Sequence, residues 1–302
     1  MRKRLIYRCD DVGYTPAYDM GIFDVIDAGI GCSADVMFDA CHAREALEMI
    51  KERPWISVGW HRHLWESPVL PAAEVPSLVN EEGRFKWGHR KKELMEEATY
   101  EDAYKEFEAQ LALCYDVLGK YPDVAGNVCD DIPLEKAFMD VCDKYEIPYG
   151  FFHRPHHRPK MANETQENYE KDQLRFRNEV KPQYEDLRII SLPIHNQYGY
   201  GLEYYKYYNP MDYMTKMEWS DQEEIYFYGW HPGFLDGHIL KESTSCIHRV
   251  REYNDALSDE YKQWIIDNHV ELINFRDALY GTNEFQDHLK AIDSPLYIGN
   301  MK

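Results

Sequence analysis

The sequence lacks the features that would tie it to a membrane or to nucleic acid. It has no apolar run of about 20 residues, the length that a helix needs to span a bilayer. Its basic opening, residues 1–4, is followed by too short an apolar stretch for a signal peptide. Positive charge is scarce: 34 Lys+Arg against 54 Asp+Glu give a formal charge of −20, which repels phosphate backbones and anionic lipids. We therefore expect no nucleic acid and no membrane as a partner.

Paired cysteines and linkers are missing as well. The 7 cysteines form an odd set without a C-x-x-C pair, which is typical of reduced thiols in a cytosolic protein. No Pro/Gly/Ser-rich linker and no repeat with a period of about 20–50 residues is visible. These absences predict a cytoplasmic protein whose residues 1–302 form a single domain, a length that α/β barrels routinely occupy.

Short apolar runs alternate with helical patterns along the chain. The strand candidates are residues 5–9, 33–38, 56–60, 124–128, 149–152, 189–192, 225–230 and 270–273, and the helical candidates are 18–28, 43–52, 100–118, 134–145, a pair within 244–268, and 276–280. Strands that alternate with helices predict a parallel sheet. About seven or eight such units favour an α/β fold with a (β/α) barrel over an open sheet. The polar segments 66–94 and 155–187 interrupt the alternation, which predicts long βα loops.

Two adjacent carboxylates, Asp10 and Asp11, directly follow the first strand candidate. In a barrel the C-terminal ends of the strands form the mouth, where barrel enzymes keep their catalytic residues. A turn or a helix cap explains the same pair equally well. On spacing alone, both interpretations stay open.

Histidines follow two further strand candidates. His61 and His63 are spaced i, i+2 after residues 56–60, so both imidazoles lie on one side of an extended chain and can converge on one ion. His231 follows residues 225–230 and precedes a Pro-Gly turn, where it can donate a proton near neutral pH. Each histidine taken alone is also explained by an ordinary hydrogen-bonded or turn-capping role. Three polar strand ends together favour a functional site.

These motifs resemble those of a known family. Residues 9–13, Cys-Asp-Asp-Val-Gly, resemble the A-D-D-F-G opening of the YdjC/ChbG-like carbohydrate deacetylases. Residues 58–61 with 68–69 are similar to the family's G-L-H-x-N-L…P-V segment, residues 231–236 to its H-P-G-x-x-D, and residues 272–277 to its closing strand and helix. The matches follow the family order along almost the whole chain.

The resemblance implies a (β/α) barrel related to the NodB-type polysaccharide deacetylases and a hydrolase that removes an acetyl group from an N-acetylated sugar. It also implies one divalent metal ion held by an Asp and two His. His and Asp ligands suit Zn²⁺ and, with more waters, Mg²⁺ or Mn²⁺. Transferred by position, Asp11 and His61 become metal ligands, Asp10 the general base and His231 the acid or oxyanion partner. Arg154 resembles an arginine that the family places near this point.

The third metal ligand departs from the family pattern. The H-x-D-x-H-x-H segment that supplies it should fall near residues 122–133, which contain no histidine. We expect Asp130 to replace it, with Asp131, Cys129 or His63 as alternatives; loss of the third ligand and weak metal binding is a further one. Asp130 is equally natural in the N-cap region of the following helix.

The remaining expectations concern the substrate. His63, His195, Trp230 and Tyr200 are candidates for binding a small carbohydrate, since aromatic rings suit sugar faces. The Tyr-rich residues 198–213 fit either a substrate groove or a homodimer contact. Because fold does not dictate chemistry, a sugar isomerase or epimerase and a non-catalytic sugar-binding barrel stay as alternative functions.

Overall fold

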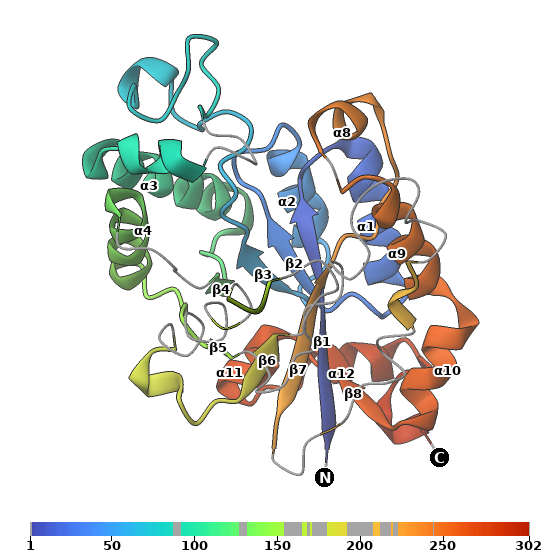
Figure 1. Ribbon diagram of the computed structural model, residues 1–302. Coiled ribbons are helices and arrows are strands. Elements are labelled where there is room, and N and C mark those ends of the chain that lie inside the picture. Colours follow the sequence, from blue (N-terminus) through green and yellow to red (C-terminus); the bar gives the residue numbers. More distant parts are fainter. Residues whose placement is uncertain are drawn as a thin grey trace.

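The computed structural model describes residues 2–86, 92–126, 132–153, 165–167, 170, 180–191, 208–211, 219, 223–243 and 245–301. Its strands are β1 Lys3–Val12, β2 Ser33–Val36, β3 Ser57–Trp60, β4 Val124–Ala125, β5 Phe152–His153, β6 Ile189–Ser191, β7 Ile225–Trp230 and β8 Val270–Leu272. Within these residues they form one 8-stranded sheet in the order β4-β3-β2-β1-β7-β6-β5, with β8 paired to β1 (Figure 1). Every pairing is parallel, as the sequence predicted.

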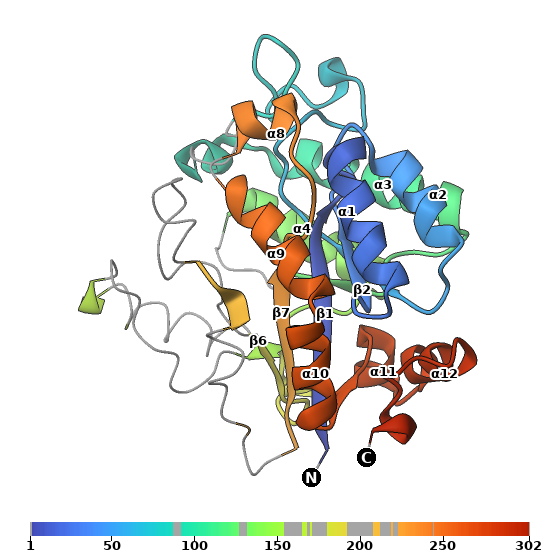
Figure 2. The same ribbon diagram turned by 90° about the vertical axis from the view of Figure 1, so that its right-hand side faces the viewer.

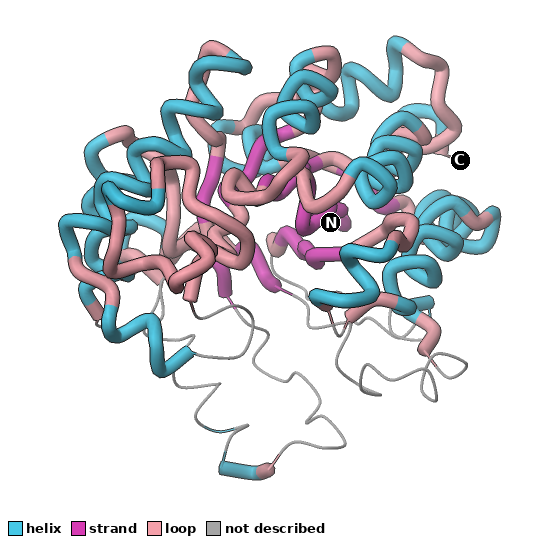
Figure 3. Tube along the Cα trace, turned by 90° about the horizontal axis from the view of Figure 1, so that it is seen from above, coloured by secondary structure: helices cyan, strands magenta, loops and turns pink. Residues whose placement is uncertain are grey.

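The sheet curls around β1, which pairs with three strands. β7 follows one side of β1, whereas β8 and β2 share the other side, β8 near its start and β2 near its end. At the two ends of the strand order, the backbone N–H of Ala125 in β4 donates to the carbonyl of Pro148, shortly before β5, at 2.8 Å. Viewed from above, the strands lie in the middle with helices around them (Figure 3). This arrangement confirms the predicted (β/α) barrel.

Helices cover the outside of the sheet (Figures 1 and 2). They are α1 Pro16–Asp27, α2 Ala43–Lys51, α3 Tyr100–Leu118, α4 Pro133–Lys144, α8 Gly237–Glu242, α9 Ile247–Leu257, α10 Asp259–Asp267, α11 Phe275–Tyr280 and α12 Glu284–Ala291, with 3₁₀ turns at Ala72–Glu74, Lys92–Glu97, Pro182–Tyr184 and Ile298–Asn300. Sequence signals set several of their ends: Thr15 accepts a hydrogen bond from the backbone of Tyr18 before α1, and α3 ends at Gly119 with a φ of 69°. The prediction omitted the short helices α8 and α12.

Two predicted absences can be compared with the described residues. No helix among them is long and apolar enough to cross a membrane. Six of the 7 cysteines lie among the described residues, and all six are free. The reduced state in solution stays a prediction.

The interior of the barrel changes from apolar to charged along β1. Beside Ile6 of β1, Phe152, Phe227 and Phe275 pack together with ring centroids 4.4–5.7 Å apart. The guanidinium of Arg8 lies 5.1 Å from the ring of Phe227, on the side of this aromatic cluster toward the C-terminal ends of the strands. Asp10 follows two residues later on the same side of the strand and pairs with Arg8. Charged groups therefore occupy the interior from Arg8 toward the C-terminal ends of the strands.

Candidate metal centre at the mouth of the barrel

An irregular backbone at the end of β1 brings two neighbouring carboxylates into the same interior. In a regular strand adjacent side chains point to opposite faces. Here the register between β1 and β2 shifts between Cys9 and Val12, and Asp11 has a φ of 62°, which is uncommon for a residue other than glycine. Asp10 is 5% exposed and Asp11 is 1% exposed. The bulge therefore turns Asp11 toward the interior that Asp10 already faces.

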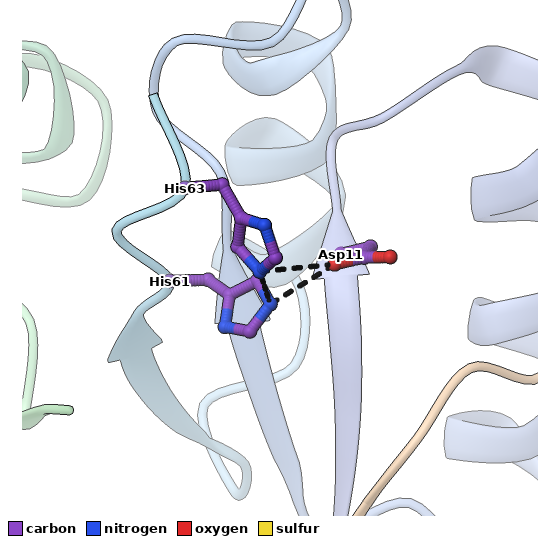
Figure 4. A group of neighbouring side chains, drawn as sticks. All are labelled: Asp11, His61 and His63. Carbon is purple, nitrogen blue, oxygen red and sulfur yellow. Dashed lines mark hydrogen bonds and ion pairs between the residues drawn. The ribbon is translucent and has the colours of Figure 1, made fainter. Parts of the chain in front are cut away.

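Asp11, His61 and His63 form a cluster with the geometry of a metal site. Oδ1 of Asp11 lies 2.9 Å from Nε2 of His61 and 3.5 Å from Nε2 of His63. The two Nε2 atoms also face one another, and one ligand atom from each residue lies within 4.8 Å of the others (Figure 4). Two imidazole nitrogens and one carboxylate oxygen are ligands that Zn²⁺ binds in enzymes, with a fourth position left for water or substrate. The residues present thus fit a divalent ion.

Arg249 in α9 holds the other oxygen of Asp11. Its Nη2 donates to Oδ2 at 2.7 Å, and both side chains are 1% exposed. The guanidinium also lies over the rings of Tyr14 and Tyr18 and donates to the carbonyl of Ser245. Burial would raise the pKa of Asp11, but Arg249 and the nearby histidines outweigh burial and hold the pKa well below its usual range. Asp11 is therefore ionised, with Oδ1 turned to the histidines.

His61 lies between carboxylates on both sides. Its Nδ1 is 2.8 Å from Oδ2 of Asp35, on the side opposite Asp11. Burial would lower the pKa of His61, but the carboxylates of Asp10, Asp11 and Asp35 outweigh burial and raise it to about 10. These surroundings favour positive charge, as on a protonated ring or a bound cation.

His231, at the end of β7, lies beside the cluster. Its Nε2 is 3.9 Å from Oδ2 of Asp11, and its Nδ1 is 3.6 Å from Oε2 of Glu252. Glu252 also accepts the backbone N–H of His231 at 2.5 Å and the hydroxyl hydrogen of Tyr208. The buried Glu252 therefore fixes the backbone that carries His231.

The structure gathers most of the described candidates at one place. Asp10, Asp11, His61, His63 and His231 all contribute to the mouth of the barrel. Trp230 lies elsewhere: its ring is 1% exposed and packs against Tyr7 and Tyr261, toward the helices outside the sheet. The other candidates lie outside the described residues, namely Asp130, Arg154, His195 and Tyr200, together with the alternatives Cys129 and Asp131.

Sequence reasoning missed four charged residues of this region: Arg8, Asp35, Arg249 and Glu252. A usable signal existed for the first two, since each is charged within a predicted buried strand. Nothing local marked Arg249 and Glu252, which lie three residues apart on an amphipathic helix and resemble solvated charges.

Glycines on the neighbouring strands make room for the interior carboxylates. A Cβ on Gly59 would lie 1.6 Å from Oδ1 of Asp35, and a Cβ on Gly229 would lie 2.1 Å from Oδ2 of Asp10. We therefore expect Gly59→Ala and Gly229→Ala each to lower the free energy of unfolding by about 1–3 kcal/mol, the usual cost of overpacking. Urea unfolding measures this change. Gly237→Ala is the control, because nothing lies within 4 Å of its Cβ position; equal midpoints for all three variants would contradict the prediction.

Comparisons with known proteins agree on one family. The family model described as YdjC-like protein matches residues 4–267. A carbohydrate deacetylase of Enterococcus faecalis is 26% identical over 281 residues, covering 90% of this chain and 97% of the relative. Carbohydrate deacetylase 2 of Listeria innocua is 25% identical over 282 residues, covering 91% and 98%. Among solved structures, an Enterococcus faecalis protein described as a cellobiose-phosphate cleavage protein matches with a TM-score of 0.65 and 25% identity, covering 92% and 99%.

Proposed function

The chain belongs to the YdjC-like family, and from this premise we propose that it is a hydrolase that removes the acetyl group from an N-acetylated sugar or oligosaccharide. The name carbohydrate deacetylase of relatives matched over nearly their whole length supports this activity. The observation that carries the proposal is the convergence of Asp11, His61 and His63 at the mouth of the barrel. This cluster would hold a divalent cation, which can activate water and polarise the carbonyl in amide hydrolysis.

We propose that one divalent ion is held by Asp11, His61 and His63. In this assignment His63 takes the place of the histidine that the family supplies from the segment near residues 122–133. Two imidazole ligands favour Zn²⁺ over Mg²⁺, which prefers oxygen. The earlier expectation that Asp130 completes the site stays a competing prediction.

The ion would act as a Lewis acid that lowers the pKa of water and polarises the acetamide carbonyl. In the proposed mechanism Asp10 accepts the proton of the attacking water as general base, while Arg8 holds both oxygens of that carboxylate at 2.6 and 2.8 Å. His231 donates a proton to the departing sugar amine. Its Nε2 lies beside the proposed metal ligands, 3.9 Å from Oδ2 of Asp11. Glu252 keeps the backbone of His231 in place.

Acetate release from N-acetylated chitooligosaccharides tests the proposal. We expect the purified protein with Zn²⁺ to release acetate, and His231→Ala to lower kcat by about 10²-fold, the smaller end of what a lost general acid costs. The zinc content of this variant should equal that of the wild type, since His231 is not among the proposed ligands. His288→Ala is the control, because His288 lies in α12, stacks on Trp55 and touches none of the site residues.

The function would be contradicted if no N-acetylated saccharide in a panel of chain lengths yields acetate. If His231→Ala works at the wild-type rate, the function survives and His231 is removed from the mechanism.

A small carbohydrate is the proposed partner, and a homodimer and a cytoplasmic location are predictions. We also retain one domain over residues 1–302, supported by the pairing of β8, close to the C-terminus, with β1.

A further inference from the structure

Below the proposed metal ligands, the barrel interior holds an ion pair that the proposed mechanism does not explain. Asp35 in β2 lies 2.8 Å from Nδ1 of His61 and 3.3 Å from Nη1 of Arg8. Its side chain is 5% exposed. We propose that Asp35 is a positioning residue for the metal ligand His61, and that Arg8 is the built-in cation that allows this carboxylate to be buried there. The inference rests on the proposed binding of metal by His61.

Asp35 fixes the orientation of the His61 ring. An imidazole that offers Nε2 to an ion carries its proton on Nδ1, and an acceptor on that side holds both the tautomer and the ring plane. Asp35 and Asp11 lie on opposite sides of the ring, at 2.8 Å from Nδ1 and 2.9 Å from Nε2. With its Nδ1–H donating to Asp35, His61 directs the Nε2 lone pair toward Asp11 and the proposed ion. A carboxylate acceptor also makes the ring a stronger ligand.

The positive charge of Arg8 offsets the unfavourable burial of the Asp35 carboxylate. Three carboxylates, those of Asp10, Asp11 and Asp35, are each at most 5% exposed, and burying charges of one sign together is unfavourable. Arg8 donates to both oxygens of Asp10 and also lies against Asp35. Burial would lower the pKa of Arg8, but the carboxylates around it outweigh burial and raise it, so it stays a cation.

Among the described residues, the same geometry leaves the mouth of the barrel with a site for one metal ion. Asp10, Asp35 and His61 have ligand atoms within 4.8 Å of one another and would form a second cation site by themselves. The guanidinium of Arg8 already pairs with both carboxylates of this group. The chain thus supplies the second positive charge at this group itself, which predicts that no second ion binds between Asp10 and Asp35.

Glycines on the neighbouring strands leave space for the carboxylates of Asp35 and Asp10. Gly59 pairs with Asp35 in the register of β2 and β3, and Gly229 pairs with Arg8 in the register of β1 and β7. A Cβ at Gly59 would overlap the Asp35 carboxylate, and one at Gly229 would overlap that of Asp10. Both adjoining strands therefore lack a side chain where the carboxylates lie.

Zinc affinity and the visible spectrum of bound Co²⁺ test the role of Asp35. We expect Asp35→Ala to weaken Zn²⁺ binding by about 10–100-fold, the usual effect of losing the hydrogen-bond partner of a metal-binding histidine, and to alter the Co²⁺ bands. Asp35→Asn keeps an oxygen that can accept a hydrogen bond from Nδ1 of His61, so its loss of Zn²⁺ affinity should be smaller. This partial rescue by the amide would not follow from a purely structural role.

Asp123 offers a matched control. It pairs with Arg276 at 2.7 Å, its side chain is 10% exposed, and it lies just before β4, at the end of the strands opposite the proposed metal ligands. Asp123→Ala removes a comparable buried ion pair, so it should lower the stability to urea while zinc affinity and the Co²⁺ spectrum stay as in the wild type.

The outcomes separate this inference from the proposed function. If the wild type binds Zn²⁺ and Asp35→Ala binds it equally well with the same Co²⁺ spectrum, the positioning role is overturned and the metal site survives. A second ion per wild-type chain that Asp35→Ala removes would overturn the role of Arg8. A wild-type chain that binds neither metal would overturn the proposed metal site and this inference with it.

Discussion

Asp11→Asn is expected to abolish stoichiometric binding of Zn²⁺ and to lower kcat/KM for acetate release by about 10⁴-fold. Asp11 supplies the carboxylate of the proposed ligand set, within 2.9 and 3.5 Å of the two histidines. The amide keeps the shape of the side chain and an oxygen for Arg249, but it removes the negative charge that holds the ion. Loss of an ion that contributes several kcal/mol, at about 1.4 kcal/mol per tenfold in rate, gives this magnitude. Metal analysis and an acetate assay measure both effects.

Asp102→Asn is the matched control for this variant. Asp102 is a buried carboxylate that accepts the backbone N–H of Ser77 at 2.9 Å and contacts none of the proposed ligands. The metal content and the kcat/KM of Asp102→Asn should equal those of the wild type. A full equivalent of zinc and an unchanged rate in Asp11→Asn would remove Asp11 from the site.

The third ligand can be identified with the same assay. We propose His63, so His63→Ala should weaken zinc binding far more than Asp130→Ala. The reverse order would return the site to the composition expected from the family pattern, with Asp130 as the replacement for the missing histidine.

The parts of this site that could be predicted are those that depend on local sequence. Apolar runs mark strands, and polar residues directly after a strand in a parallel sheet must meet at one edge. This reasoning was sufficient to bring Asp10, Asp11, His61 and His231 to one mouth. The i, i+2 spacing also predicted that His61 and His63 share a side, as they do (Figure 4).

The parts that could not be predicted depend on strand register and on a backbone irregularity. Asp35 meets His61 because β2 and β3 are aligned so that Asp35 pairs with Gly59, and nothing in either strand alone sets that alignment. The positive φ of Asp11 arises within a bulge, which strand periodicity does not reveal. Arg249 reaches Asp11 from a helix 238 residues further along the chain.

Arg249→Met is expected to lower the free energy of unfolding of the metal-free protein by about 3–5 kcal/mol. Removing one partner of a buried ion pair leaves the other charge uncompensated, and here both partners are 1% exposed. Methionine keeps an unbranched side chain of similar length beneath Tyr14 and Tyr18, so the loss of charge dominates the effect. Urea unfolding of the metal-free proteins measures the difference.

Added Zn²⁺ should reduce this loss. In the metal-free variant only the nearby histidines offset the charge of Asp11, whereas a bound ion supplies a further positive charge on the Oδ1 side. Without Arg249, the full charge of Asp11 is available to the ion, so zinc should bind the variant more tightly. Because a ligand that binds more tightly stabilises the folded state more, the variant should gain more stability from zinc than the wild type gains.

Arg276→Met separates this coupling from the general cost of breaking a buried ion pair. Arg276 pairs with Asp123 and Glu284, and its side chain is 13% exposed. Its loss should destabilise the protein equally with and without zinc, because neither carboxylate is near the proposed ligands. If zinc leaves the defect of Arg249→Met unchanged as well, Asp11 does not share its charge between the arginine and an ion. The strong pairing of Asp11 with Arg249 would then have a structural role alone.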